Sequence, residues 1–167
     1  MPGVIESYDS ETGLARVRPS LKERSGSETQ ASSYPIITGV PVVFPRTKTV
    51  GIKLPLKRGD SGVILFSERS LERWIASGGG EVDPEDTRKF HLSDGMFIPG
   101  LYPKGQTLRG KGSSDDLELI NGTTSIMVKP DGFEAVVKPP AGPETRLILD
   151  ASGLKVIAGS SVMSLKV

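Results

Sequence analysis

The chain has 167 residues, enough for one domain or for a small domain with an appendage, and its 21 basic and 20 acidic residues nearly balance. This balance gives no general attraction to nucleic acid or to anionic membranes, and the absence of Cys excludes disulfides and thiolate sites. The 20 Gly and 13 Pro argue against a helical bundle and favour an all-β chain of short strands. The first residues show no signal-peptide pattern and no apolar run is long enough for a bilayer, so we expect synthesis in the cytoplasm.

The first hundred residues are predicted to form short strands around one small core. Residues 3–21 predict a hairpin that ends at Pro19, because proline has no N–H to donate to a ladder. The polar residues 22–33 predict a surface loop. Further strands are expected at residues 36–37, 40–44, 50–54 and 62–66. The last of these is continuously apolar, which is typical of a strand covered on both faces. Together the strands predict a closed OB-fold-like barrel over residues 1–103.

A short helix is predicted after the last of these strands. Ser70 is the expected N-cap, and Leu71, Trp74 and Ile75 then lie on one helical face. The glycine run at residues 78–80 ends the helix. The composition of residues 104–116 is that of a linker, so the first domain is expected to end before it.

An internal repeat follows the linker, within residues 117–167. Residues 124–135 match residues 145–156 at an offset of 21, and each copy has a strand, a turn with a glycine, and a second strand. A further strand is expected at residues 162–167. Each copy therefore predicts a β-hairpin, and a hairpin alone is marginal in water.

The apolar side chains of this repeat need a partner surface that the tail itself does not contain. They are Ile126, Val128, Phe133, Leu147, Leu149, Leu154 and Val156. Three copies wrapped around one axis would bury them, which predicts a homotrimer with an intertwined β-helix or β-prism shaft. The alternative is a small β-sandwich packed on the barrel. It is disfavoured because about 50 residues rarely build a core alone.

Two motifs resemble catalytic or nucleotide-binding loops. Residues 59–62, Gly-Asp-Ser-Gly, resemble the nucleophile loop of serine proteases, which needs a His base. The chain has one His, His91, and it follows Ser61, whereas those proteases place it before the serine. Residues 105–111 resemble a phosphate-binding loop, but Gly112 stands where Ser or Thr should reach Mg²⁺. We therefore predict that the protein is not an enzyme.

No metal or cofactor site is predicted. His91, Ser93 and Asp94 are neighbours, but strand alternation would place Asp94 on the opposite face from the other two. The carboxylates of residues 83–86 lack the ligand spacing of a calcium loop, so a solvated loop is expected there.

One basic window keeps a nucleic-acid function open. It contains Arg46, Lys48, Lys53, Lys57 and Arg58, close to Phe44. OB-folds bind single strands with basic grooves and stacking aromatics. This alternative, a single-stranded nucleic-acid-binding protein, is disfavoured because the window has one aromatic residue and the whole chain is nearly neutral.

Four segments carry a resemblance to a known family. They are PGVIESYDSETGLARVRP, YPIITGVPVVFP, LKRGDSGVILFSERSLERW and DTRKFHLSDGMFIPG. Over about residues 3–103 the chain resembles the N-terminal domain of phage baseplate central spike proteins, the puncturing proteins of contractile tails and related contractile injection systems. The last two segments are the most specific.

The resemblance implies a virion protein made in the host cytoplasm. Its parts would be an OB-fold collar (1–103) on a tail hub or tube protein, a linker (104–116) and a trimeric β-helical shaft (117–167) that pierces the host outer membrane without enzymatic chemistry. Many members end in an apex that binds iron through paired His residues, and this chain lacks a second His. We therefore expect a separate tip protein to cover the end formed by Met163, Leu165 and Val167.

Overall fold

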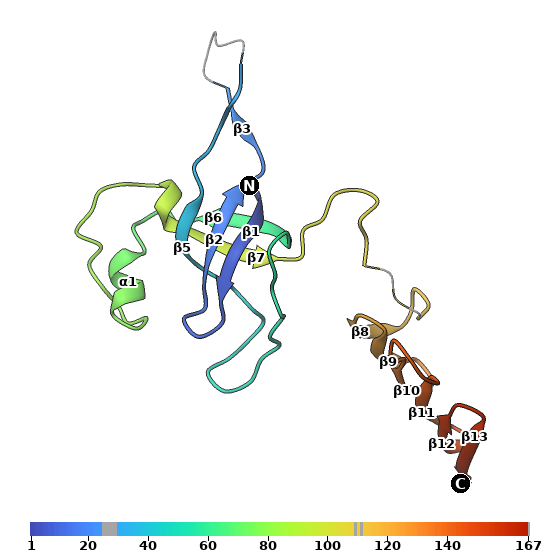
Figure 1. Cartoon of the computed structure of the whole chain (residues 1–167). Coiled ribbons are helices and arrows are strands. Elements are labelled where there is room, and N and C mark those ends of the chain that lie inside the picture. The colour runs from blue at the N-terminus through green and yellow to red at the C-terminus, as the bar shows by residue number, and fades with distance from the viewer. Residues whose placement is uncertain (25–29, 109, 111, 167) are drawn as a thin grey trace. The chain divides into compact units, whose positions relative to one another are not determined.

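The computed structural model describes residues 1–24, 30–108, 110 and 112–166 (Figure 1). The chain divides into two compact units, Met1–Gln106 and Thr107–Val167. Within the described residues no helix is long and apolar enough to cross a membrane. The prediction of a mainly β chain is confirmed, because both units are built on antiparallel sheets.

The N-terminal unit contains a five-stranded sheet. Its order is β5-β2-β1-β6-β7, and its strands are β1 (Pro2–Asp9), β2 (Leu14–Pro19), β5 (Ile37–Pro41), β6 (Ser61–Phe66) and β7 (Gly95–Pro99). The predicted hairpin is confirmed, and β2 ends at Pro19. Other strand predictions were wrong: β5 is one strand where two were expected, and residues 50–54 form none. The polar loop contains a short ladder of β3 (Lys22–Glu23) and β4 (Ser32–Ser33), and its residues 25–29 lie outside the described ones.

The two outer strands of this sheet approach each other at one point. A single parallel bridge joins Val42, just after β5, to Phe97 of β7, and the amide of Val43 donates to the carbonyl of Phe97 (2.8 Å). The sheet therefore curls until its edges touch, but the ladder that would close the predicted barrel does not form.

The core lies inside this curled sheet. Ile5, Val17, Ile64 and Phe97 are fully buried there, each from a different strand. Leu65 is 46% exposed, however, so β6 is covered on one face and not on both as predicted. Its continuous apolar run reflects a core face and a partly open outer face.

A long connection, residues 67–94, joins β6 to β7, and we call it the excursion. It contains α1 (Glu72–Ala76) and a short 3₁₀ helix, η1 (Leu92–Asp94). Leu71, not Ser70, occupies the N-cap position of α1, and its side chain makes no capping hydrogen bond. No residue of α1 is buried, so the apolar face predicted for this helix is left partly open to solvent.

The C-terminal unit is a six-stranded antiparallel meander. Its strands are β8 (Leu117–Asn121), β9 (Thr124–Lys129), β10 (Gly132–Val137), β11 (Thr145–Asp150), β12 (Gly153–Ala158) and β13 (Ser161–Lys166), each paired with the next. The two predicted hairpins are confirmed: β9 and β11, like β10 and β12, start 21 residues apart. Each inner strand, β9 to β12, pairs on both sides with strands of the same chain. The structure is therefore a meander and not the solenoid expected for an intertwined β-helix.

Glycine opens the second strand of each hairpin for a steric reason. Gly153 has φ +118°, and a Cβ atom placed there would lie 2.2 Å from the carbonyl oxygen of Leu165 on β13. Gly132 is also crowded, since its Cβ would lie 2.5 Å from the carbonyl oxygen of Leu149. The repeated glycine therefore allows the next strand to pair closely.

Candidate functional site

One face of the C-terminal sheet is lined with apolar side chains. Residues directly opposite each other in an antiparallel ladder lie on the same face, and the pairing creates two rows across the six strands. The first row is Leu117, Val128, Phe133, Leu149, Leu154 and Leu165. The second row is Leu119, Ile126, Ala135, Leu147, Val156 and Met163. We call these twelve residues the apolar face.

The structure places all seven predicted packing residues on the apolar face, together with Met163 and Leu165. Val167 lies outside the described residues. Sequence reasoning missed Leu117, Leu119 and Ala135, although the alternation in β8 matches that of the repeat.

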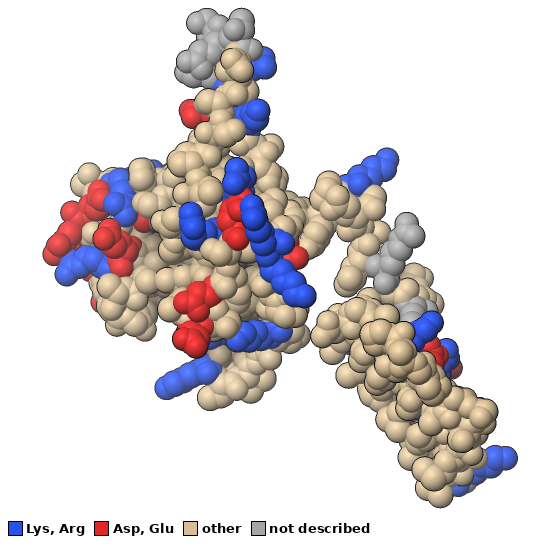
Figure 2. Space-filling view, viewed as in Figure 1, with Lys and Arg blue, Asp and Glu red and all other residues tan. Residues whose placement is uncertain are grey.

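Much of the apolar face is in contact with solvent. Eight of its twelve residues are exposed, by fractions from 39% at Leu147 to 74% at Leu165, and the other four, Phe133, Ala135, Leu154 and Val156, are partly buried. Monomeric proteins rarely leave a continuous apolar surface of this kind open, and such patches mark interaction sites. In the view of Figure 2, few charged atoms appear on this unit. The apolar face is the strongest candidate for a binding surface in this part of the chain.

Charged groups on the opposite face of the same sheet pair with one another, although the buried Ser125 hydroxyl there has no hydrogen-bond partner. Glu134 is buried and accepts from Lys129 Nζ (2.5 Å) and Arg146 Nη1 (3.3 Å). The hydrogen bond from Lys129 to Glu134 raises the pKa of Lys129 above its usual value. Before β8, the amide of Gly112 donates to Glu118 Oε2 (3.1 Å), so the chain leading into the sheet lies against its first strand. This side of the sheet therefore needs a partner less than the apolar face does.

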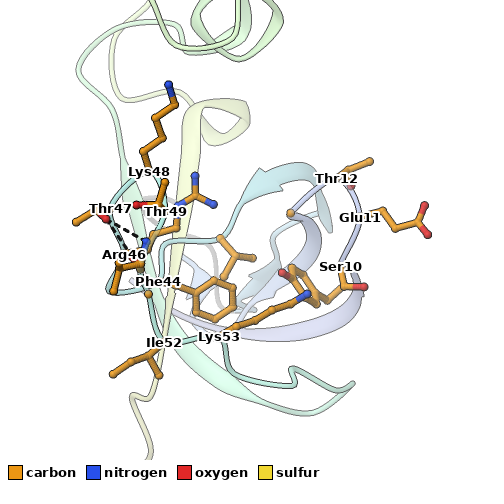
Figure 3. A pocket seen from close by; sticks show the side chains of 15 residues that line it. Ser10, Glu11, Thr12, Phe44, Arg46, Thr47, Lys48, Thr49, Ile52 and Lys53 are labelled. Carbon is orange, nitrogen blue, oxygen red and sulfur yellow. Dashed lines mark hydrogen bonds between the residues drawn. The ribbon is translucent and has the colours of Figure 1, made fainter.

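A second candidate site is a pocket of about 430 Å³ in the N-terminal unit, between the β1–β2 turn and residues 44–53. Tyr8 and Phe44 meet edge to face there, with ring centroids 6.3 Å apart. Arg46, Lys48 and Lys53 line it. Figure 3 shows Lys53 extending toward Ser10 while Lys48 points away. The pocket thus gathers three cations of the predicted basic window. The window's other two cations, Lys57 and Arg58, do not line the pocket, and Arg58 pairs with Glu6 (3.2 Å).

The residues that resembled catalytic groups have structural partners. The Ser61 hydroxyl donates to the Gly3 carbonyl (3.4 Å). His91 Nδ1 lies 2.8 Å from Ser93 Oγ and accepts from the Ser93 amide. These residues lead into η1 and not into a strand, so the alternation argument used for Asp94 was wrong. Over the described ranges, no group of three or more His, Asp or Glu side chains could hold a metal.

Asp94 anchors the excursion through a buried ion pair that sequence reasoning did not find. Its carboxylate accepts from Arg88 Nε (2.8 Å) and Nη2 (3.0 Å), and also from the Leu71 amide (3.0 Å) at the start of α1. The Arg88 hydrogen bond holds the pKa of Asp94 below its usual value, against the opposing effect of burial. Arg88 also donates to the Ser70 hydroxyl (2.7 Å), so Ser70 is part of this anchor, while Leu71 holds the N-cap position of α1.

The N-terminal unit, with its curled sheet, is the part of the chain that a known family covers. Residues 1–100 match the family described as phage protein Gp138 N-terminal domain, and the chain belongs to that family. Gp138 is a phage baseplate- and spike-related protein. The predicted resemblance is confirmed at the level of a phage structural protein. A comparison with curated proteins finds no match.

Proposed function

We propose that the chain is the central spike of a contractile phage tail or related injection system. In this proposal three copies associate through the apolar face, and the N-terminal unit forms an OB-type collar on the tail hub or tube protein. On sheath contraction the spike pierces the host cell envelope by force alone. The observation that carries the proposal is the apolar face, which crosses all six strands of the C-terminal unit and has eight exposed apolar residues.

The strand pairing favours one form of the shaft. Because β9 to β12 pair within the chain, three copies would pack sheet face against sheet face, as a β-prism, rather than exchange inner strands. The edges of β8 and β13 remain for pairing between copies. The strand order and the bridge between Val42 and Phe97 support the OB-type collar, since an OB-fold is a five-stranded, partly open barrel.

A separate tip protein is part of the proposal. Met163 and Leu165 on β13 are 69% and 74% exposed, the highest values on the apolar face. A partner with its own apolar base would cover this end. Electron microscopy of the intact particle tests this point, and axial density that stops at the last residue of this chain would contradict it.

The mass of the full chain tests the main proposal. Light scattering should give a threefold mass that persists on dilution, as expected of a closed cyclic assembly, and images of the particles should show a narrow spike. A stable monomer would contradict the proposal. Mass spectrometry of purified virions should detect the chain in the baseplate fraction.

The second candidate function is binding of single-stranded nucleic acid in the pocket of Figure 3. The Tyr8–Phe44 pair and the three neighbouring cations favour it, since OB-folds combine basic grooves with aromatic platforms. Salt-dependent binding of single-stranded DNA by the full chain would support this function. Unchanged mobility of the DNA would exclude it.

A further inference from the structure

The N-terminal unit carries a basic surface on the connection between β5 and β6. We call residues 44–54 the basic arm. It contains Arg46, Lys48 and Lys53 and no acidic residue. None of these three cations makes an ion pair within the described part of the chain. Beside them Val50 and Ile52 are 72% and 53% exposed. The surface therefore combines unpaired positive charge with open apolar side chains.

The basic arm has a defined shape. Arg46 and Gly51 form an antiparallel bridge, the Thr47 amide donates to the Val50 carbonyl (2.6 Å), and the Ile52 amide donates to the Pro45 carbonyl (3.0 Å). Gly51 permits this crossing, since a Cβ there would lie 2.5 Å from the Cβ of Arg46. A surface that is already folded loses little entropy when it binds.

An acidic surface lies elsewhere on the same unit. We call residues 72–86 the acidic ledge. Four carboxylates within residues 81–86, with no basic residue among them, follow α1. Arg73 of α1 holds this segment by donating to the Asp83 carbonyl (3.0 Å) and by pairing with Glu85. Trp74 and Ile75 are 43% and 37% exposed on the helix itself.

The two surfaces are separate within one copy. Figure 1 shows α1 and the β5–β6 connection on different sides of the unit, and Figure 2 shows acidic atoms gathered near α1 and basic atoms over the β5–β6 connection. In the described residues no ion pair joins the arm to the ledge. The arm carries only positive charge. The ledge carries a net negative charge, although Glu85 pairs with Arg73 and Asp86 with Arg88. Both surfaces also expose apolar side chains, so each complements the other.

We propose that the basic arm of one copy docks on the acidic ledge of the next copy. This inference rests on the proposed threefold assembly, because a cyclic trimer needs a heterologous contact between two different patches of each copy. A twofold contact of arm with arm would bring like charges together. The collar would then close as a ring of three identical contacts, with the apolar side chains at their centre and the charges at their rim.

Cysteine cross-linking of the full chain tests the contact directly, because the chain has no Cys of its own. Thr49→Cys places a thiol at the exposed tip of the arm, and Gly80→Cys places one beside the ledge, where a Cβ meets no atom within 4 Å. A short bis-maleimide should convert the double variant to covalent trimer. Each single variant has one thiol per copy, so its cross-linking should stop at dimer. The control pair, Thr49→Cys with the likewise exposed Lys22→Cys, should give no trimer.

Charge reversal tests the chemistry of the same contact. Replacing Arg46, Lys48 and Lys53 with Glu in the double-Cys variant should lower the yield of covalent trimer about 10-fold. Adding Glu81→Lys and Asp83→Lys should restore it. A full chain that is trimeric by light scattering but does not cross-link between arm and ledge would overturn this inference and leave the proposed function standing. A monomer would overturn both.

Nucleic acid is the competing occupant of the arm. If the wild-type chain bound single-stranded DNA, lost that binding on charge reversal and gave no cross-link between arm and ledge, the arm would belong to a nucleic-acid site. That result would overturn the inference.

Discussion

Leu149→Asp should dissociate the trimer, because Leu149 lies in the middle of the apolar face. It pairs with Phe133 on one side and Leu154 on the other, and it is 51% exposed in a single copy. Burying the remaining half of a Leu side chain contributes about 1 kcal/mol per copy, or about 3 kcal/mol per trimer. Its loss alone corresponds to a roughly 100-fold weaker assembly. The buried carboxylates add a desolvation cost of several kcal/mol each.

Val162→Asp provides the matched control. Val162 is 59% exposed, but it pairs with Ile157 on the opposite face of the same sheet. A monomer would tolerate both substitutions equally, because both side chains are similarly open to solvent. Sedimentation at several concentrations should therefore show a trimer for Val162→Asp and a monomer for Leu149→Asp, both with wild-type circular dichroism. Equal masses for the two variants would refute the assignment of the apolar face as the interface.

Three further substitutions test the stability of the two units. Asp94→Asn should destabilise the N-terminal unit by about 2–3 kcal/mol, because it removes one partner of a buried ion pair; thermal unfolding followed by the fluorescence of Trp74 measures this, with Glu81→Gln as an exposed control. The folded-state pKa of Asp94 is lowered, so the stabilisation is present above the unfolded pKa of about 4 and is lost as the pH falls further; a wild-type acid transition with the same slope as that of Asp94→Asn would contradict this. Gly153→Ala should cost about 1–3 kcal/mol in the C-terminal unit, since φ is +118° and the Leu165 carbonyl is 2.2 Å from the new Cβ, and a variant as resistant to proteolysis as the wild type would contradict the strand contact. Phe97→Ala should cost about 3–5 kcal/mol in denaturant unfolding because the ring is fully buried, and a loss below about 1 kcal/mol would place the core elsewhere.

The features that could be predicted from sequence were local ones. The hairpins of the C-terminal unit follow from alternation and from turn glycines, and both signals lie within a few residues of each other. The apolar face follows almost directly, because period-2 alternation places Ile126, Val128 and their counterparts on one side of the sheet. The number of strands was underestimated because β8 stands outside the repeat.

The features that could not be predicted depend on residues far apart in the chain. Residues 50–54 alternate like a strand, but they find no neighbouring strand and form part of the projecting arm. The fifth strand of the N-terminal sheet is β7, which reaches β6 only after the whole excursion. The hydrogen bonds of Arg88 to Asp94 and to Ser70 also depend on the fold. No spacing rule connects these three residues in the sequence.

Salt should separate the two contacts proposed between copies. The apolar face carries no charge, and burial of apolar surface is not weakened by screening. The arm and ledge attract through exposed charges, and the Debye length falls from about 10 Å at 0.1 M to about 3 Å at 1 M salt. Raising NaCl to about 1 M should therefore lower the cross-linking between Thr49→Cys and Gly80→Cys while the mass by light scattering stays threefold. If cross-linking and mass fell together, the collar contact would be holding the trimer, and the apolar face would not be its main interface.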